Sequence, residues 1–477
     1  MDRQLYRTVN LIIFIFYFVS SDYGIDYIPY IVSFFWGILI LVWDFFTERV
    51  MFKQPYWYIL FAFCISYVIS ILTNFPTNLV PNGMNLVYLA IQVFIFYAVD
   101  PKVQSEKRDR QFQRMNDVYI VLTFVLALIS IGLFVFNISY VTPEGQRQGF
   151  IENRLFGLFT SPNIGGMFGY LSCLMMLANN YFKRGSWKKF QWFYIFNGVV
   201  QYLYFVLARS RGTRLAIIGL LVFLFIMYAL KIFHSKEKKI QKTLLTFLVI
   251  MGAYASFDVM NEVSKVGLSY VPGVVNNLIT PATEKVVIDD SGNETTVQVK
   301  EPIKKVVIEN SAENLEVSAG RFTIWEAGLQ LVKQRPLFGV ADSYVYRSGE
   351  LSTNIDEAPL SEMNKRELRR IKGNLHNTYL AVLVKSGVVG FLILMIFVFL
   401  ILKDNYKFLM DKRISFNNES IQIYVIMLAF LLSLFVNELV ENHLVFNNRD
   451  VMGLVFWSYL GFLNHFRLET MKKLELQ

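Results

Sequence analysis

The sequence has few of the residues from which soluble and secreted domains are built. Only 17% of its 477 residues are charged, and it contains two cysteines and four histidines. A soluble protein of this length would carry more charge. Cys64 and Cys173 both lie inside apolar segments, which argues against a disulfide framework and against a cysteine metal site. The sequence is therefore not that of an ordinary soluble domain.

Motifs that bind nucleotides are also absent. There is no GxxxxGK[ST] loop and no Rossmann glycine fingerprint. The acidic pair Asp289–Asp290 falls in a predicted hairpin turn rather than in a context that would hold a metal for sugar-nucleotide transfer. We therefore expect no cofactor, no metal and no nucleic-acid partner, and a substrate that is already activated within the membrane.

Long apolar segments dominate what is present. Hydrophobic residues make up 54% of the chain and aromatic residues 16%. Apolar runs of roughly 17 to 22 residues, enough to cross a hydrocarbon core of about 30 Å as a helix, recur along the chain. The alternation typical of a membrane barrel is missing, so helices are the remaining way to span a bilayer. We predict about twelve spans, near residues 5–21, 26–46, 55–73, 84–99, 118–138, 162–182, 190–208, 212–233, 243–260, 378–402, 420–440 and 449–466.

Lysine and arginine alternate between the short connections. Cations lie before the first span, at Arg3 and Arg7, and again in every second connection, as in residues 102–114. The connections between them are poor in cations, and residues 74–83 have none. Because cytoplasmic loops retain cations, we predict a multi-pass protein of the bacterial cytoplasmic membrane with both termini in the cytoplasm. The first span lacks a cleavage site, so we expect it to be retained.

A polar segment at residues 261–375 separates an N-terminal membrane bundle, 1–260, from C-terminal membrane helices, 376–477. The charge alternation places this segment outside the cytoplasm. It contains a β-hairpin signal near 284–310 and two short helices, one ending at Pro336 and one before Gly373. We therefore predict an all-α polytopic membrane protein with one large extracytoplasmic loop domain, of the kind that usually covers a site.

Three arginines in "LARSRGTRLA" break the charge rule, because Arg209, Arg211 and Arg214 fall in a short external connection. They could snorkel to lipid headgroups. They could instead bind a fixed anion, because the arginine fork suits phosphate and the start of the next helix offers backbone amides. Arg154 and Asn163, in a second external segment, are candidates on the same face, although Pro162 there is explained by a helix start.

His376 is the main titratable candidate of this external face. It stands beside Asn377 at the mouth of an apolar segment, where a structural role is the ordinary explanation. A base beside cations is, however, the arrangement that transfer from a phosphate-linked donor requires. Arg321 and Trp325, one turn apart on the predicted loop helix, join the candidate site.

His443 is a rival base in the external segment "NELVENHLVFNNRD". It is accompanied there by Glu438, which we take as a substrate-binding candidate, and by Glu441. His234 and His465 fall at predicted cytoplasmic ends and are set aside.

The segments "GRFTIWEAGLQLVKQRPLFGVA" and "HNTYLAVLVKSGVVGFLIL" together resemble the shared motif of the O-antigen ligase and Wzy polymerase superfamily. That motif is an arginine, a tryptophan, a Pro-Leu-Phe-Gly turn, and His-Asn before a glycine-containing helix. "FGLFTSPNIGG" and the "SRG" at 210–212 are similar to upstream motifs of the family. The chain departs from the pattern in its extra hairpin-like segment, which leaves acceptor recognition open.

The resemblance implies a GT-C-type glycosyltransferase that acts on an undecaprenyl-diphosphate-linked glycan. His376 matches the proposed general base, and Arg211 and Arg321 match arginines that hold the diphosphate. Arg154 corresponds less securely. The implied partners are the lipid-linked donor, a glycan acceptor and membrane lipids, with a flippase and a chain-length regulator as further candidates.

The sequence is compatible with several functions. A polymerase of capsule, exopolysaccharide or O-antigen repeats is favoured over a ligase by the large loop and by the Lys/Phe/Tyr/Ile-rich composition. A lipid-linked oligosaccharide flippase or transporter would show internal repeats and a central line of cations, and we find neither. A purely structural scaffold would leave the external arginines unexplained.

Overall fold

The structure is a computed structural model. It describes residues 2–20, 27–142, 145–182, 187–234, 239–280, 283–288, 294–299, 303–309, 321–344, 355, 358–370, 374–446 and 450–476. The first nine α-helices are α1 (Arg3–Ser20), α2 (Tyr27–Trp43), α3 (Trp57–Thr73), α4 (Leu79–Ile91), α5 (Ser105–Val135), α6 (Pro162–Phe182), α7 (Trp187–Ala208), α8 (Arg211–His234) and α9 (Lys239–Leu268). They are followed by α10 (Val271–Ile279), α11 (Arg321–Gln334), α12 (Glu362–Arg370), α13 (Thr378–Met410), α14 (Glu419–Asn437) and α15 (Val451–Glu475). Short π-helical or 3₁₀ turns occupy Asp44–Glu48, Met51–Lys53 and Gln92–Phe96.

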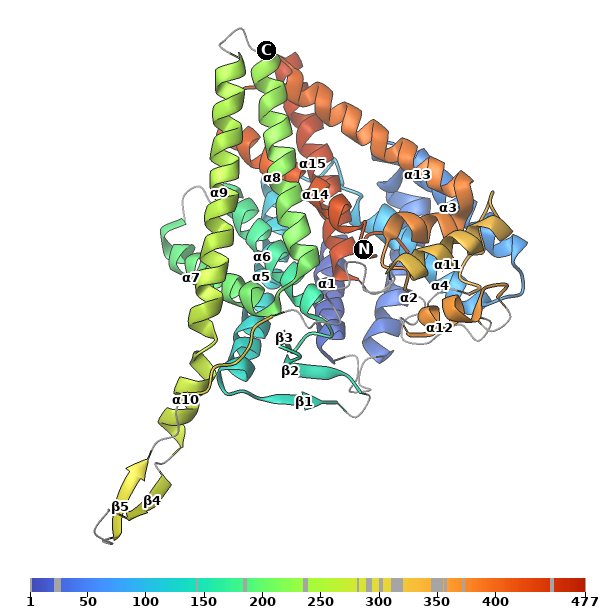
Figure 1. Ribbon diagram of the computed structural model, residues 1–477. Coiled ribbons are helices and arrows are strands. Elements are labelled where there is room, and N and C mark those ends of the chain that lie inside the picture. Colours follow the sequence, from blue (N-terminus) through green and yellow to red (C-terminus); the bar gives the residue numbers. More distant parts are fainter. Residues whose placement is uncertain are drawn as a thin grey trace.

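Each of the twelve predicted spans overlaps one of these helices, and the long helices pack as a bundle (Figure 1). Within the described residues, seven segments have the length and composition to cross a membrane: Ile28–Glu48, Leu79–Phe96, Ser105–Val135, Arg211–Phe233, Lys239–Ile279, Thr378–Met410 and Glu419–Asn437. The helix α3 is apolar but has only 17 residues. A mostly helical fold with several apolar spans is confirmed, whereas the count of twelve stays a prediction.

Cationic side chains at one end of the bundle donate to backbone carbonyl groups of other segments. Arg7 donates to the carbonyl oxygens of Ile95 and Ala98, which joins the N-terminus to the end of the α4 segment. At the same end, Nζ of Lys231 donates to the carbonyl oxygen of Leu409 at 2.9 Å. The alternation of the connections and the assignment of this end to the cytoplasm stay predictions.

A small antiparallel sheet that the sequence pattern did not indicate lies at the other end. It consists of β1 (Ser139–Val141), β2 (Arg147–Ile151) and β3 (Arg154–Gly157), in the order β1-β2-β3. The strands have only three to five residues, too few for a period-two pattern to be read. The sheet matters for the site because Arg154 is the first residue of β3.

The predicted hairpin is present as β4 (Thr283–Ile288) and β5 (Glu294–Val299), paired antiparallel. In Figure 1 it lies at the tip of an arm formed by α9 and α10, away from the bundle. The two predicted loop helices are also present as α11 and α12. The turn "SGN" of the hairpin and Gly373 lie outside the described residues.

The helix α13 is interrupted by the Pro-Leu-Phe-Gly segment. Gly387 has a φ of +65°, which breaks the helical backbone. Val340 N donates to the carbonyl oxygen of Val384 at 2.8 Å, and Val388 N donates to the carbonyl oxygen of Pro336 at 2.8 Å. The inserted segment therefore satisfies backbone groups that the break would leave unpaired. The Pro-Leu-Phe-Gly segment and the glycine-containing helix after His376, which are apart in the sequence, are thus in direct backbone contact.

A second apolar cluster, separate from the main core, fixes the loop helices on the start of α13. Ile324, Ala327 and Leu331 of α11 are buried together with Leu368 of α12 and Ala381 of α13. These residues recur at helical spacing along α11. The cluster thereby holds Arg321, the first residue of α11, beside His376.

Candidate active site

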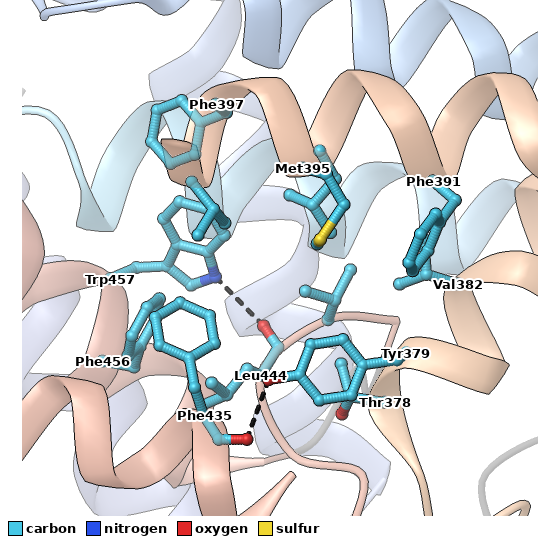
Figure 2. A pocket seen from close by; sticks show the side chains of 13 residues that line it. Thr378, Tyr379, Val382, Phe391, Met395, Phe397, Phe435, Leu444, Phe456 and Trp457 are labelled. Atoms are coloured by element: carbon cyan, nitrogen blue, oxygen red, sulfur yellow. Dashed lines mark hydrogen bonds between the residues drawn. The ribbon is translucent and has the colours of Figure 1, made fainter. Parts of the chain in front are cut away.

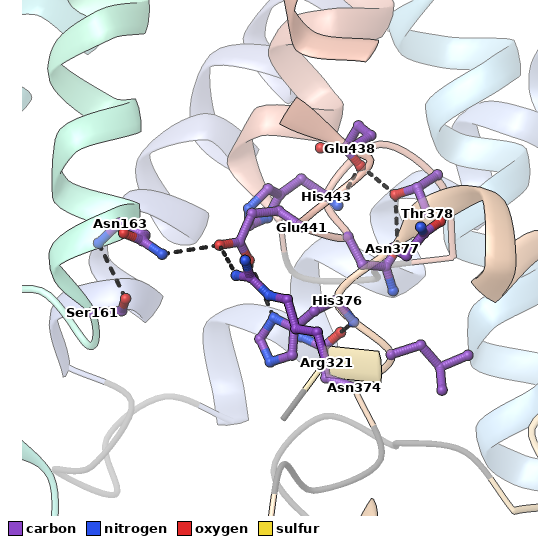
Figure 3. A network of polar contacts seen from close by, with 12 residues as sticks. Ser161, Asn163, Arg321, Asn374, His376, Asn377, Thr378, Glu438, Glu441 and His443 are labelled. Carbon is purple, nitrogen blue, oxygen red and sulfur yellow. Dashed lines mark hydrogen bonds and ion pairs between the residues drawn. The ribbon is translucent and has the colours of Figure 1, made fainter. Parts of the chain in front are cut away.

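Glu441, in the loop between α14 and α15, is the centre of a polar cluster (Figure 3). Its Oε1 accepts a hydrogen bond from Nδ2 of Asn163 at 3.0 Å. Arg321 forms an ion pair with the same oxygen at 3.3 Å. Nδ1 of His376 lies 3.2 Å from Oε2. One carboxylate thus joins residues from the start of α6, the start of α11 and the entry to α13.

Local backbone structure fixes the position of His376. Its φ is +45°, a left-handed conformation that a non-glycine residue adopts only where its surroundings enforce it. Its N–H donates to Oδ1 of Asn374 at 3.0 Å. The next residue, Asn377, caps α13 by accepting from Leu380 N at 2.9 Å. Asn377 therefore has a structural role as a helix cap, and the side chain of His376, 31% exposed, remains accessible beside Glu441.

Trp325 supports the same place from α11. Its Nε1 donates to the carbonyl oxygen of Leu375 at 3.2 Å. This bond links the helix that carries Arg321 to the residue directly before His376. The predicted arginine and tryptophan of the loop helix are thus both brought to the histidine.

Arg154 approaches the cluster through Asn163. Its Nε donates to the carbonyl oxygen of Ala208 at 3.0 Å, and an Nη donates to Oδ1 of Asn163 at 3.3 Å. Burial, and then the positive charge of Arg211, lower the pKa of Arg154 to about 10. The guanidinium therefore has neutral oxygen partners and a cationic neighbour, an arrangement that favours an anion nearby.

The three arginines at the α7–α8 turn behave differently from one another. Arg209 pairs with Glu262 at 2.9 Å, and Arg214 pairs with Asp258 at 2.5 Å, so both face α9. Arg211 is exposed and has no ion pair within the described part of the chain. The structure therefore leaves Arg211 as the uncommitted cation of the three and does not bring Arg209 or Arg214 to Glu441.

Glu438 and His443 lie beneath the cluster and shape its loop. Oε2 of Glu438 accepts from His443 N at 2.8 Å and from Leu444 N at 3.1 Å, and it also accepts from the hydroxyl of Thr378. Burial raises the pKa of Glu438 to about 7. The ring of His443 is buried against Asp450. The rival histidine is thus enclosed, and both side chains fold the loop that presents Glu441.

The ionisation of Glu441 follows from its neighbours. Burial opposes its charge, but the hydrogen bond and charge of His376, and the charges of His443 and Arg321, outweigh it and lower the pKa to about 2. The sequence placed Glu441 only in the company of His443. Its signal was an acid in a predicted external loop, and pattern alone cannot choose between Glu441 and Glu438, three positions earlier.

Among the described residues, no group of three or more His, Cys, Asp and Glu side chains could hold a metal ion.

A narrow apolar crevice of about 30 Å³ begins two residues after His376 (Figure 2). Thr378 and Tyr379 line it at the start of α13, together with further side chains of α13, α14 and α15. The hydroxyl of Tyr379 donates to the carbonyl oxygen of Phe435 at 2.8 Å, and Nε1 of Trp457 donates to that of Leu444 at 3.0 Å. The polar atoms of its two largest rings are therefore satisfied, and apolar surface faces the space.

A family model described as Wzy_C, O-Antigen ligase, matches residues 196–395. The matched segment, 200 of the 477 residues, is similar to this domain. The resemblance recognised from the motifs is confirmed. The matched segment includes Arg211, Arg321 and His376 but not Arg154 or Glu441. The polar cluster therefore contains residues from inside and outside the matched segment. No curated protein matches the chain.

Proposed function

We propose that the protein is a glycosyltransferase of the outer face of the bacterial cytoplasmic membrane. It transfers a glycan from undecaprenyl diphosphate to a hydroxyl group of an acceptor sugar. The observation that carries the proposal is the convergence of His376 and Arg321 on Glu441, beside the uncommitted Arg211. The O-antigen ligase family match supports a lipid-linked glycan as substrate.

His376 acts in this proposal as the general base. Nδ1 faces the carboxylate of Glu441, which leaves Nε2 for the acceptor hydroxyl. The hydroxyl oxygen attacks the anomeric carbon, its proton passes to Nε2, and the bond from that carbon to the diphosphate oxygen breaks. Glu441, ionised because its pKa is about 2, fixes the ring orientation and stabilises the imidazolium that forms, as in other base–carboxylate pairs.

Charge on the departing diphosphate is balanced by arginine. Arg321 pairs with Glu441, Arg154 donates to Asn163 of the same cluster, and the charge of Arg211 acts on Arg154. The resulting excess of positive charge suits a diphosphate dianion. Preorganised donors of this kind stabilise the charge that develops on a leaving group, and the site needs no metal for that task in our proposal.

The apolar crevice supports a lipid-linked donor. It starts at Thr378 and Tyr379, next to the proposed base, and continues along α13, α14 and α15. A polyprenyl chain that entered between these helices would keep its diphosphate near His376. The predicted topology, with both termini cytoplasmic and the 261–375 domain outside, places this end on the extracytoplasmic side.

We favour a polymerase that joins lipid-linked repeat units. The large external loop supports this choice, because a growing chain and an incoming repeat must both be accommodated. The description of the matching family as O-antigen ligase favours the second candidate, transfer to another acceptor. The two candidates share the chemistry and differ in the acceptor.

The test is complementation of a deletion strain with wild-type or His376→Ala protein, followed by analysis of lipid-linked glycans. A polymerase predicts single repeat units on the carrier when His376 is replaced. A ligase predicts long chains that remain on the carrier. Wild-type surface glycan in the His376→Ala strain, at equal protein abundance, would reject the proposed base.

A further inference from the structure

Asn437, the last residue of α14, carries a buried amide that no described residue satisfies. It is 1% exposed. Neither Oδ1 nor Nδ2 has a hydrogen-bond partner in the described part of the chain. Folded proteins rarely leave both ends of a buried amide unpaired, and such groups call for an explanation. The location of this amide supplies one.

The amide lies against the first turn of α8. A methyl group on the Cα of Gly212 would be 2.9 Å from Oδ1 of Asn437 and 3.8 Å from Oε1 of Glu441. Gly212 directly follows Arg211, which is exposed and has no ion pair with any described residue. The amide of Asn437, the exposed Arg211 and Glu441, the centre of the polar cluster, therefore lie at the start of α8.

The first turn of α8 is itself suited to an anion. Helix starts leave backbone N–H groups without acceptors inside the helix and carry a partial positive charge. Here the oxygen atoms of Ser210 accept from Thr213 N at 3.2 Å and from Arg214 N at 3.1 Å. The N–H groups of Arg211 and Gly212 have no acceptor recorded within the described residues. Gly212 has no side chain, so Asn437 can lie close to this backbone.

We propose that Asn437 is a phosphate ligand of the donor site. Its Nδ2 donates to an oxygen of the phosphate that bears the transferred sugar, while Arg211 and the start of α8 hold the same group. This assignment rests on the proposed function, since it names a residue for the diphosphate of that donor. It also accounts for the Nδ2 group of an amide near Glu441 that no described residue satisfies.

The test uses the full-length protein in detergent and farnesyl diphosphate as a short isoprenyl diphosphate. Thermal stabilisation measured over a range of concentrations gives the dissociation constant. Farnesol and inorganic diphosphate serve as the two partial probes and separate lipid binding from phosphate binding. We compare Asn437→Leu and the isosteric Asn437→Asp with the wild type.

We expect both variants to bind farnesyl diphosphate at least tenfold more weakly, with farnesol binding unchanged. The melting temperature of Asn437→Leu without ligand should equal or exceed that of the wild type, because an unpaired buried amide is removed. The matched control is Asn464→Leu, since Asn464 is also buried and its Oδ1 also lacks a partner, but it lies on α15 at the opposite end. Its affinity should be that of the wild type.

Wild-type affinity in both Asn437 variants would overturn the assignment. If Arg211→Gln still lost binding in that case, the proposed diphosphate site would stand without Asn437. A lower melting temperature of Asn437→Leu with unchanged affinity would show a purely structural amide and would also overturn it. A wild-type protein that does not bind farnesyl diphosphate would reject the proposed donor itself.

Discussion

Nδ1 of His376 lies 3.2 Å from Oε2 of Glu441, although the two residues are 65 positions apart in the chain. The carboxylate is buried, and the histidine is partly exposed. A buried acid behind an accessible imidazole holds the ring in one orientation and stabilises its charged form. The pair thus gives His376 a chemical reason to act as a base that its sequence neighbours do not provide.

Glu441→Gln should lower turnover by about 100-fold or more, the scale typical of general acid–base catalysis. The amide is isosteric but neutral, so the imidazolium is no longer stabilised. Turnover of purified protein on a lipid-linked repeat unit measures this. The double variant with His376→Ala should be no slower than His376→Ala alone, because the two residues act as one unit. Additive losses would contradict the pairing.

Arg211→Ala should also lose about 100-fold or more in rate, because one preorganised donor to developing charge is removed. Arg211→Lys should recover part of the rate, since it restores the charge without the planar fork. The matched control is Arg110→Ala on α5, an exposed arginine paired with Glu106. Near-normal turnover of Arg211→Ala, with the control unchanged, would remove Arg211 from the site.

A mostly helical fold with several apolar spans could be predicted from the sequence, because apolar run length is a local property. His376, Arg321 and Trp325 were predicted as one site, and the structure brings them together through the second apolar cluster. Glu438 was predicted to bind substrate, whereas Glu441 is the acid that the structure brings to His376. Which of two acids in one loop faces a histidine depends on how the loop folds, and that depends on buried contacts distant in the sequence.

The arginine cluster shows the same limit. Arg209, Arg211 and Arg214 follow one another at a helix start and look equivalent in the sequence. Acids on α9, Glu262 and Asp258, neutralise two of them. Pairing between neighbouring helices has no signature in either helix alone. The strands β1 to β3 were missed for a related reason, since their few residues carry no readable alternation.

Gly387→Ala should destabilise the protein strongly. Gly387 has a φ of +65°, and a methyl group there would lie 2.3 Å from the carbonyl oxygen of Leu337. A side chain in this conformation costs about 1–3 kcal/mol through backbone strain alone, and the clash would push the Pro-Leu-Phe-Gly segment out of the break in α13. The melting temperature in detergent measures the loss.

Gly198→Ala on α7 is the matched control for this substitution. No atom lies within 4 Å of a methyl group at Gly198, and alanine favours a helix over glycine by about 1 kcal/mol. Its melting temperature should therefore equal or exceed that of the wild type. Equal stability of Gly387→Ala and Gly198→Ala would contradict the observed insertion.

His443 should make stability depend on pH. Burial opposes its charge, but the carboxylates of Asp450, Glu438 and Glu441 outweigh burial and raise its pKa from 6.5 to about 10. A raised pKa means that the folded state holds the proton more tightly. The stabilisation is therefore complete below pH 6.5 and is lost as the pH rises through about 10.

The melting temperature of the wild type should accordingly fall between pH 7 and pH 10 by more than that of His443→Gln. Other groups titrate in both proteins, so the difference between the two curves isolates the histidine. Parallel curves would show that the ring is not charged in the folded protein.

The buried ion pair between Lys385 and Asp342 offers a test of the contact that joins the two motifs. Nζ of Lys385 lies 3.0 Å from Oδ1 of Asp342, and both side chains are at most 4% exposed. Lys385→Met or Asp342→Asn alone leaves one buried charge unpaired, which typically costs about 3–5 kcal/mol. The double variant removes both charges, and asparagine at 342 can still accept from Asn85. Its melting temperature should therefore recover toward the wild-type value, whereas losses that simply add would mean that the two charges do not interact.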